Sequence, residues 1–371
     1  MLGYSISVAS IKGIPVKVHW TFLLLFIWIG YIGFTAGMNS TGIFRFCLFT
    51  LILFVCIILH EYGHALTARR FGVKTQDIII SPIGGVARLK KIPEKPRHEF
   101  LIAIAGPAVN LIISMIIGFS LWFFSSQGLN IIGDQSNVFN YLSNFLPMLF
   151  WLNIMLIIFN MLPAFPMDGG RILRSLLSIR LGRKRATRVA SVLGQGVALF
   201  LIGFAIFKGE LILGIIGIFI FFSAANEYRM VRYESFLSAN TVSNVYRSSF
   251  TIISLHEEMT RPIDLLRRDI EHDFLVEDGQ GNLVGVLHEE FILDAMKNKD
   301  FMSPVSHYVS LKLEPISLTL NLKELFYKLQ NQGYSILPVY HDGQVVGVVD
   351  RRTLNNFIRI HNRVLKFGGK T

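Results

Sequence analysis

Six stretches of about 20 apolar residues fill most of the first 230 positions of this 371-residue chain. A transmembrane helix needs about 20 such residues because the hydrocarbon core of a bilayer is about 30 Å thick. The composition agrees, since 52% of the residues are hydrophobic and only 16% are charged, against about 25% charged in an average soluble domain. The sequence therefore predicts a polytopic α-helical membrane protein. The predicted spans are residues 18–37, 43–71, 100–125, 145–161, 189–207 and 211–228.

Lysine and arginine are distributed unequally between the two ends of these spans. Nineteen of them flank one side, whereas Arg45 and Lys208 lie on the other. Cytoplasmic connections carry such an excess, so we expect a multi-pass protein of the cell membrane with both termini in the cytoplasm. The same distribution accounts for the net charge of +11, and we expect no nucleic-acid partner. The N-terminal segment MLGYSISVASIKGIPVKVHW lacks the pattern of a signal peptide and is expected to lead from the cytoplasm into the first span.

The composition becomes that of a soluble protein after about Ser238. Two similar units follow, FLVEDGQGNLVGVLHEEFILDAM and ILPVYHDGQVVGVVDRRTLNNFI, and their Val-Gly-Val strands begin at Val284 and Val346. Each unit has the pattern strand, turn, strand, helix, which indicates a tandem repeat of α/β modules. The predicted domains are residues 1–230 in the membrane, then modules at 238–300 and 301–371.

A short β-type segment, KTQDIIISPIGGVARLKKIP, connects the second and third spans. Its β-branched residues are broken by SPIGG, which predicts a hairpin over about residues 75–91. We expect either a plain structural hairpin or one that pairs with an extended substrate, along Ile78–Ser81 or Val86–Leu89.

The second span ends in HEYGH, residues 60–64. On a helix, His60 and His64 lie at i and i+4 on one face, where both imidazoles can bind the same metal ion. Glu61 lies beside them, placed to take a proton from water at the metal. The alternative is a solvated helix end, but His60 lies about 13 Å along the helix from Arg69, inside the span. Intramembrane ionisable groups are generally functional.

A catalytic zinc site needs a third protein ligand. The fourth span ends in NMLPAFPMDGGRIL, where Asp168 is the only acidic residue. The two prolines break the helix and the two glycines allow backbone to approach a metal closely. The alternative for Asp168 is a cap of the next helix. Cys56, one turn before His60, is a weaker candidate ligand, and we expect it to pack with apolar neighbours.

Several motifs together resemble the site-2 proteases, the intramembrane zinc metalloproteases. They are HEYGH, GPAVN in the third span, NMLPAFPMDGGR after the fourth, GIPVKVHW and SPIGGVARL, and the resemblance covers residues 1 to about 230. It implies one zinc ion held by His60, His64 and Asp168, with Glu61 as the general base.

The same resemblance implies that Asn160 helps to hold the substrate or to polarise its carbonyl. Pro163, in the same motif, is a second candidate for substrate binding. Asn110 of GPAVN is expected to pack between helices rather than to take part in the chemistry.

The two C-terminal modules resemble a pair of cystathionine-β-synthase (CBS) domains, a regulatory unit that often binds adenine nucleotides. The nucleotide-contact pattern is only partly present. His288 and Phe291 occupy its positions in the first module, and Asp350 and Thr353 occupy them in the second. The resemblance therefore leaves open whether an adenine nucleotide or nothing binds there. It also implies that two copies of the chain can associate through these modules.

The leading hypothesis is an intramembrane zinc endopeptidase that cuts membrane-anchored proteins near the cytoplasmic face, regulated by its CBS pair. A transporter or channel gated by CBS domains is an alternative, but the chain has no evident internal repeat with polar groups at the membrane midplane. An inactive membrane scaffold is a further alternative, which the intact HEYGH motif and Asp168 disfavour.

Overall fold

The computed structural model describes residues 5–82, 84–89, 95–126, 138–269 and 271–367. The chain divides into two compact units, Met1–Val231 and Arg232–Thr371. The boundary falls inside α6, a helix that begins in the first unit and ends in the second.

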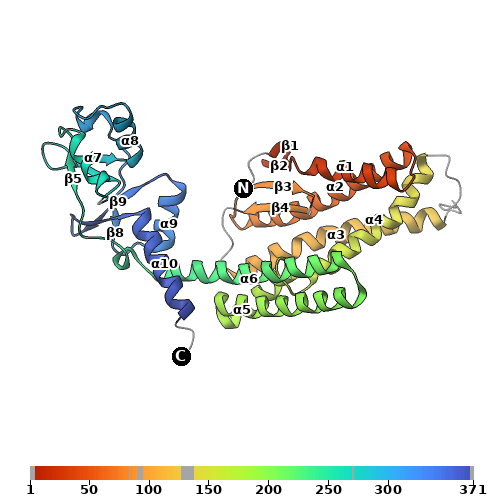
Figure 1. Ribbon diagram of the computed structural model, residues 1–371. Coiled ribbons are helices and arrows are strands. Elements are labelled where there is room, and N and C mark those ends of the chain that lie inside the picture. The colour runs from red at the N-terminus through yellow and green to blue at the C-terminus, as the bar shows by residue number, and fades with distance from the viewer. Residues whose placement is uncertain (1–4, 83, 90–94, 127–137, 270, 368–371) are drawn as a thin grey trace. The chain divides into compact units, whose positions relative to one another are not determined.

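The described part of the first unit contains six apolar helices (Figure 1). They are α1 (Phe22–Thr35), α2 (Ser40–Arg70), α3 (Pro96–Ser126), α4 (Val138–Met161), α5 (Asp168–Lys208) and α6 (Leu211–Ala239). Four of them, α2, α3, α5 and α6, are long and apolar enough to cross a membrane, whereas α1 and the apolar part of α4, Phe145–Met161, are shorter.

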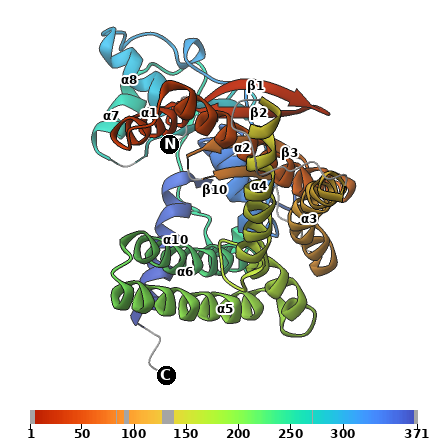
Figure 2. The ribbon, with the colours of Figure 1, turned by 90° about the vertical axis from the view of Figure 1, so that its right-hand side faces the viewer.

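Two glycines shape the last helical pair of this unit. Gly182 has φ of 73° and ψ of 157° and interrupts α5 before its apolar half. Gly209, with φ of 72°, ends α5 in the left-handed conformation that glycine adopts readily. As a result, α5 and α6 lie side by side and run antiparallel, which both Figure 1 and Figure 2 show.

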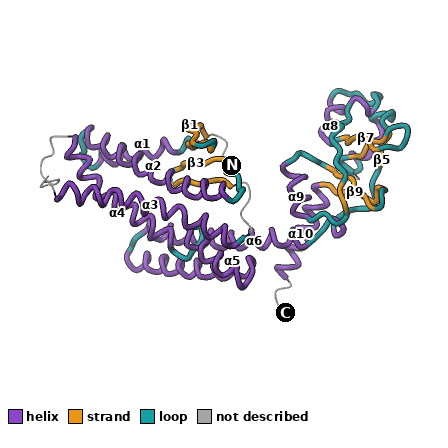
Figure 3. The backbone as a smooth tube through the Cα atoms, turned by 180° about the vertical axis from the view of Figure 1, so that it is seen from behind, coloured by secondary structure: helices purple, strands orange, loops and turns teal. Residues whose placement is uncertain are grey.

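A four-stranded sheet lies at the C-terminal end of α2, from which β3 follows (Figure 3). Its strands are β1 (Ser5–Ile11), β2 (Ile14–His19), β3 (Thr75–Ser81) and β4 (Gly84–Leu89), in the order β1-β2-β3-β4. The expected hairpin of 75–91 is β3 and β4, except that residues 83, 90 and 91 lie outside the described residues.

The N-terminal residues form more structure than the sequence analysis anticipates. Instead of a simple lead into the first span, β1 and β2 make a hairpin whose turn, Lys12 and Gly13, has positive φ at both positions. Such two-residue turns match the twist of paired strands. Because β2 pairs with β3 in parallel, β3 has neighbours on both sides. An incoming strand therefore cannot pair with Ile78–Ser81, whereas β4 is an edge strand of the sheet.

A buried carboxylate ties three of these strands together. Asp77 on β3 is fully buried and forms ion pairs with Arg88 on β4 and, at 2.9 Å, with Lys17 on β2. The hydrogen bond from Arg88, together with that from Lys17, lowers the pKa of Asp77 despite its burial. These contacts fix β4 against β3.

The helix α3 is the centre of the packing in the first unit. It lies so close to α2 that a Cβ on Gly63 would be 2.7 Å from the carbonyl oxygen of Ala105. It also reaches α5 and α6 through Arg174, which is 1% exposed and forms ion pairs with Glu99 on α3 and Glu227 on α6. The charge distribution of the sequence places Arg174 among the residues that flank the spans, but it is a buried link between three helices.

The second unit consists of two modules with the same order of elements. The first has β5 (Ile252–Ser254), α7 (Thr260–Arg267), β6 (Phe274–Glu277), β7 (Leu283–Leu287) and α8 (Glu289–Lys297). The second has β8 (Ile316–Ser317), α9 (Leu322–Asn331), β9 (Ile336–His341), β10 (Gln344–Asp350) and α10 (Arg351–Phe367). In each module the first strand pairs in parallel with the second, which pairs antiparallel with the third. This is the tandem α/β repeat that the two Val-Gly-Val strands predicted.

Candidate metal centre

The C-terminal half of α2 presents two imidazoles to the interior. His60 and His64 are 6% and 4% exposed, and their Nε2 atoms are 3.1 Å apart. They project from one face of the helix because they are four residues apart. The HEYGH motif therefore has the local geometry that its spacing predicts.

Asp168 lies against both imidazoles. Its Oδ2 atom is 3.2 Å from Nε2 of His60 and 3.0 Å from Nε2 of His64. It is the first residue of α5, and the N-cap position belongs to Met167, so Asp168 does not cap this helix. Gly169 and Gly170 let this turn press against the backbone of the preceding loop, where a Cβ on either would collide with main-chain atoms.

The three donor atoms fit a metal ion. Ligands about 2.0–2.1 Å from a tetrahedral zinc lie about 3.3–3.4 Å from one another, close to the 3.0–3.2 Å found here. Nδ1 of His64 is 2.6 Å from the carbonyl oxygen of Ile102. A carbonyl can only accept, so Nδ1 carries the proton and Nε2 offers its lone pair. Two imidazole nitrogens and a carboxylate oxygen this close together form a donor set that fits a metal cation between them.

Gly106 on α3 leaves room for that cation. A Cβ at this position would collide with Nε2 of His64 and lie 2.6 Å from Nε2 of His60. The third helix therefore covers the donor atoms with bare backbone, and no side chain longer than hydrogen fits there.

Glu61 lies in a small cavity beside the two histidines. The cavity has a volume of about 220 Å³, and α2, α3, α4 and β4 all contribute to its wall. Its lining residues are Ile57, His60, Glu61, Gly84, Gly85, Asn110, Leu156 and Asn160. The backbone N–H of Ala87 on β4 donates to Oε2 of Glu61 at 2.9 Å. The edge strand thus fixes the orientation of the carboxylate.

The other residues that the sequence singled out divide into two groups. Asn160 lines the cavity, whereas Pro163 is exposed and is not among the lining residues. Cys56 is buried in an apolar cluster with Phe49 and Leu149, which agrees with the expected packing role.

Asn110 is a further residue of the cavity wall. It lines the cavity with Glu61 and Asn160, although its expected role is packing between helices. Its place four residues after Gly106 in GPAVN was a usable signal, because residues i and i+4 share one face of a helix.

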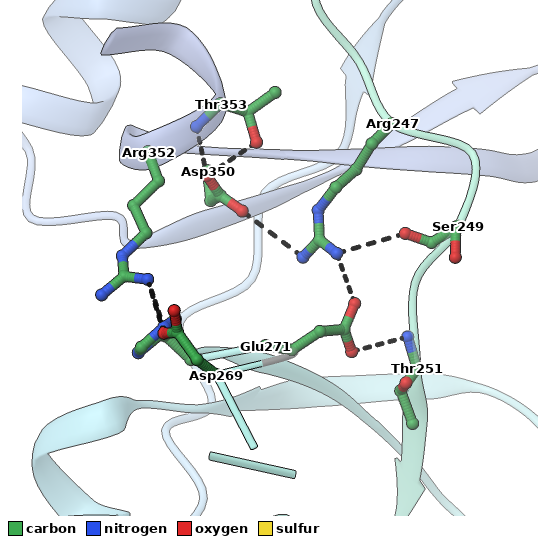
Figure 4. A network of polar contacts seen from close by, with 9 residues as sticks. Arg247, Ser249, Thr251, Asp269, Glu271, Asp350, Arg352 and Thr353 are labelled. Atoms are coloured by element: carbon green, nitrogen blue, oxygen red, sulfur yellow. Dashed lines mark hydrogen bonds and ion pairs between the residues drawn. The ribbon is translucent and has the colours of Figure 1, made fainter. Parts of the chain in front are cut away.

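The second unit contains a larger polar cleft of about 570 Å³ between its two modules. Charged residues of both modules meet there (Figure 4). Arg247 forms ion pairs with Glu271 and, at 3.4 Å, with Asp350, and Arg352 lies 3.3 Å from Asp269. The cleft is therefore bridged by ion pairs between the two modules.

Equivalent positions of the two modules carry opposite charges in this cleft. Glu289 and Glu290 begin α8, whereas Arg351 and Arg352, at the matching positions of the second module, begin α10. Asp273 adds a half-buried carboxylate to the acidic side. Burial alone would raise its pKa, but hydrogen bonds from His288 and Ser335 outweigh that effect and lower it. The two helix starts that border the cleft are thus of opposite charge, acidic at α8 and basic at α10.

The fold and the site define a membrane metalloprotein whose centre combines two histidines from one helix with an aspartate from another. Comparisons with known proteins identify the family. The model of peptidase family M50 matches residues 48–134 and 125–204, and the CBS domain model matches residues 299–359.

Individual proteins agree with the family models. The chain is 39% identical over 237 residues to zinc metalloprotease MJ0392 of Methanocaldococcus jannaschii, a match that covers 63% of this chain and 63% of that protein. It is 26% identical over 377 residues to the protein sll0528 of Synechocystis sp., covering 94% of each. The solved structure of the site-2 protease from Methanocaldococcus jannaschii is 38% identical, with a TM-score of 0.44, and covers 61% of this chain and 95% of that one. The chain belongs to the site-2 proteases, peptidase family M50, and carries C-terminal CBS domains.

The Gly106→Ala substitution tests the space above the imidazoles. We expect it to lower zinc affinity by about tenfold or more, because the new methyl group collides with the donor nitrogens. Gly203→Ala on α5 is the matched control, since a Cβ there meets no atom within 4 Å. The measurement is zinc content after dialysis against graded chelator. Equal zinc retention in both variants would contradict this geometry.

Proposed function

We propose that the protein is an intramembrane zinc endopeptidase that hydrolyses membrane-anchored proteins. The observation that supports this most is the meeting of His60, His64 and Asp168 within 3.2 Å of one another, with Glu61 at the wall of the adjoining cavity. In this proposal the first three residues hold one zinc ion and Glu61 acts as the general base.

Zinc, when bound, supplies a Lewis acid that acidifies water and polarises a peptide carbonyl. The carboxylate of Glu61 accepts the proton from the attacking water and later delivers it to the leaving amine. The N–H of Ala87 keeps this carboxylate aimed into the cavity. Asn160, from α4, places an amide donor where it can bind the substrate carbonyl.

The substrates in this proposal are membrane-anchored proteins cut near the cytoplasmic face. The metal centre lies at the end of α2 that precedes Arg69 and Arg70, and such basic residues mark the cytoplasmic side. Both termini are then cytoplasmic as well. Peptide hydrolysis at one metal ion accounts for this group of residues, so a transport function is not required to explain them.

A helical substrate has to unwind before it can be cut, which exposes backbone groups in a medium without water. We propose that the unwound segment lies along the free edge of β4. The N–H of Ala87 points away from β3, toward Glu61. Because hydrogen-bonding directions repeat every second residue, the backbone of Gly85 also faces the cavity, and a paired substrate would pass beside the general base.

The function is tested with Glu61→Gln and Asp168→Ala. The probe is a set of purified single-span proteins with glycine, asparagine or proline inside the span, reconstituted in liposomes with the enzyme. Loss of a general base is expected to lower the cleavage rate by about 100-fold or more. Glu61→Gln should still hold about one zinc per chain, and Asp168→Ala should lose it.

Mass spectrometry gives the products and elemental analysis gives the zinc. Cleavage by Glu61→Gln at the wild-type rate would contradict the assignment of the base. A wild-type chain that takes up no zinc would contradict the metal centre itself.

The strand pairing is tested by disulfide crosslinking in the Glu61→Gln background. With Cys47 and Cys56 replaced by serine and alanine, Val86→Cys on β4 is paired with cysteines scanned along the substrate span. Strand addition predicts crosslinks at every second substrate position. Ile6→Cys on β1, the opposite edge of the sheet and 74% exposed, is the control. Crosslinks with a helical period, or equal crosslinking at Ile6, would refute the pairing.

We also propose that the cleft of the second unit binds one adenine nucleotide and so regulates cleavage. The opposite charges of the two helix starts support a single orientation, with phosphate at Arg351 and Arg352 where α10 begins. Phe291 and Thr353 stand where the CBS pattern often has a ribose-binding acid, so contacts to phosphate and base carry the binding.

Arg352→Gln tests this nucleotide site. Removing a charge-assisted hydrogen bond is expected to weaken binding of AMP or ATP by about tenfold or more. Lys297→Gln removes the same charge from an exposed position outside the cleft and should leave affinity unchanged. Equilibrium dialysis of the full chain with labelled nucleotide is the measurement. If neither AMP nor ATP bound to the wild-type chain, the proposal that the cleft holds an adenine nucleotide would be wrong.

A further inference from the structure

Asn110 is a fully buried polar residue whose side-chain carboxamide has no hydrogen-bond partner among the described residues. It lies on α3 and is 0% exposed. Neither Oδ1 nor Nδ2 of its carboxamide forms a hydrogen bond with any residue that the structure describes. Buried amides are nearly always paired, because leaving both atoms unsatisfied costs their full desolvation. An unpaired buried carboxamide therefore needs an explanation.

A common structural role of such a residue is a hydrogen bond to a main-chain carbonyl, and Asn153 provides the comparison. Asn153 on α4 is equally buried and its Oδ1 is also unpaired, but its Nδ2 donates to the carbonyl oxygen of Leu149 at 2.9 Å and it does not line the cavity. The hydroxyl of Ser114 bonds only the main-chain oxygen of Asn110. Among the described residues, none forms a hydrogen bond with the side-chain carboxamide of Asn110.

The position of Asn110 gives the explanation. It lines the cavity that contains Glu61, His60 and Asn160. It is one helical turn beyond Gly106, the residue that covers the two imidazoles, so it lies on the same face of α3 about 6 Å farther along the axis. Asn110 thus borders the space in which the proposed substrate peptide would lie.

We propose that Asn110 binds the main chain of the substrate. A carboxamide offers one acceptor and two donors, which complements the carbonyl and N–H of a peptide group. The bond is available only when the substrate is extended, because a helix already satisfies its own groups. This inference rests on the proposed protease function and adds a substrate-binding residue from α3 to it.

The spacing predicts which peptide group Asn110 meets. About 6 Å along α3 separates it from Gly106, and an extended chain advances about 3.3 Å per residue. Asn110 therefore binds a peptide group about two residues from the scissile bond. Recognition of the backbone rather than a side chain makes this contact independent of substrate sequence.

Two zinc-binding probes separate this role from a structural one. Acetohydroxamate can bind the metal alone, whereas a tripeptide hydroxamate adds peptide groups that extend into the cavity. For zinc-loaded Asn110→Leu we expect the dissociation constant of the tripeptide hydroxamate to rise about tenfold or more. That of acetohydroxamate should stay within about twofold. Asn153→Leu, the matched control, should change neither.

Wild-type affinity of Asn110→Leu for both probes, or equal weakening of both, would overturn the inference, since the second result indicates a structural effect on the metal site. Asn110→Ser serves as a second variant if the leucine variant does not fold, and the same difference between probes is expected. If the zinc-loaded wild type bound neither probe, the proposed metal function would fail and this inference would fail with it.

Discussion

One face of α3 organises the metal centre. Glu99, Ile102, Gly106 and Asn110 follow one another at intervals of three, four and four residues, so all four lie on the same side of the helix. Glu99 holds Arg174 of α5, Ile102 accepts from His64, Gly106 makes room for the metal, and Asn110 faces the cavity. Because the ligands come from α2 and α5, their separation depends on this single helix between them.

The ion pair of Arg174 explains why Asp168 can be held firmly at a helix start. The two residues are six positions apart on α5, and the buried guanidinium fixes that turn to α3 and α6. Burying such charges is costly, and breaking one partner leaves the other uncompensated. The energetic cost of burying these charges indicates that the ion pairs serve to position α5 and not only to stabilise the fold. Through the ion pair of Glu99 with Arg174, α3 also sets the position of Asp168 along the helices relative to the two histidines.

Local features of the site could be predicted from the sequence, and long-range ones could not. HEYGH fixes two imidazoles by helix periodicity, and Asp168 follows from being the only acidic residue at the right depth. The parallel pairing of β2 with β3 joins segments on either side of α1 and α2, which no local pattern encodes. The turn at Lys12 and Gly13 has a glycine that favours positive φ, but a pattern of apolar spans carries no information about such a turn. The role proposed for Asn110 cannot be read from the sequence, because it depends on the lack of a side-chain partner among the described residues.

The cavity beside Glu61 is walled by groups that suit an unwound peptide. Breaking a helix inside a membrane exposes carbonyls and N–H groups that have no water to bond. Here the edge of β4 offers backbone groups on one side, while Asn110 and Asn160 offer carboxamides from α3 and α4. None of these groups is charged, so substrate binding to them does not require the desolvation of an ion. The general base is held by the same strand through Ala87. A substrate that pairs with this strand is therefore brought to the base by the contacts that stabilise its extended form.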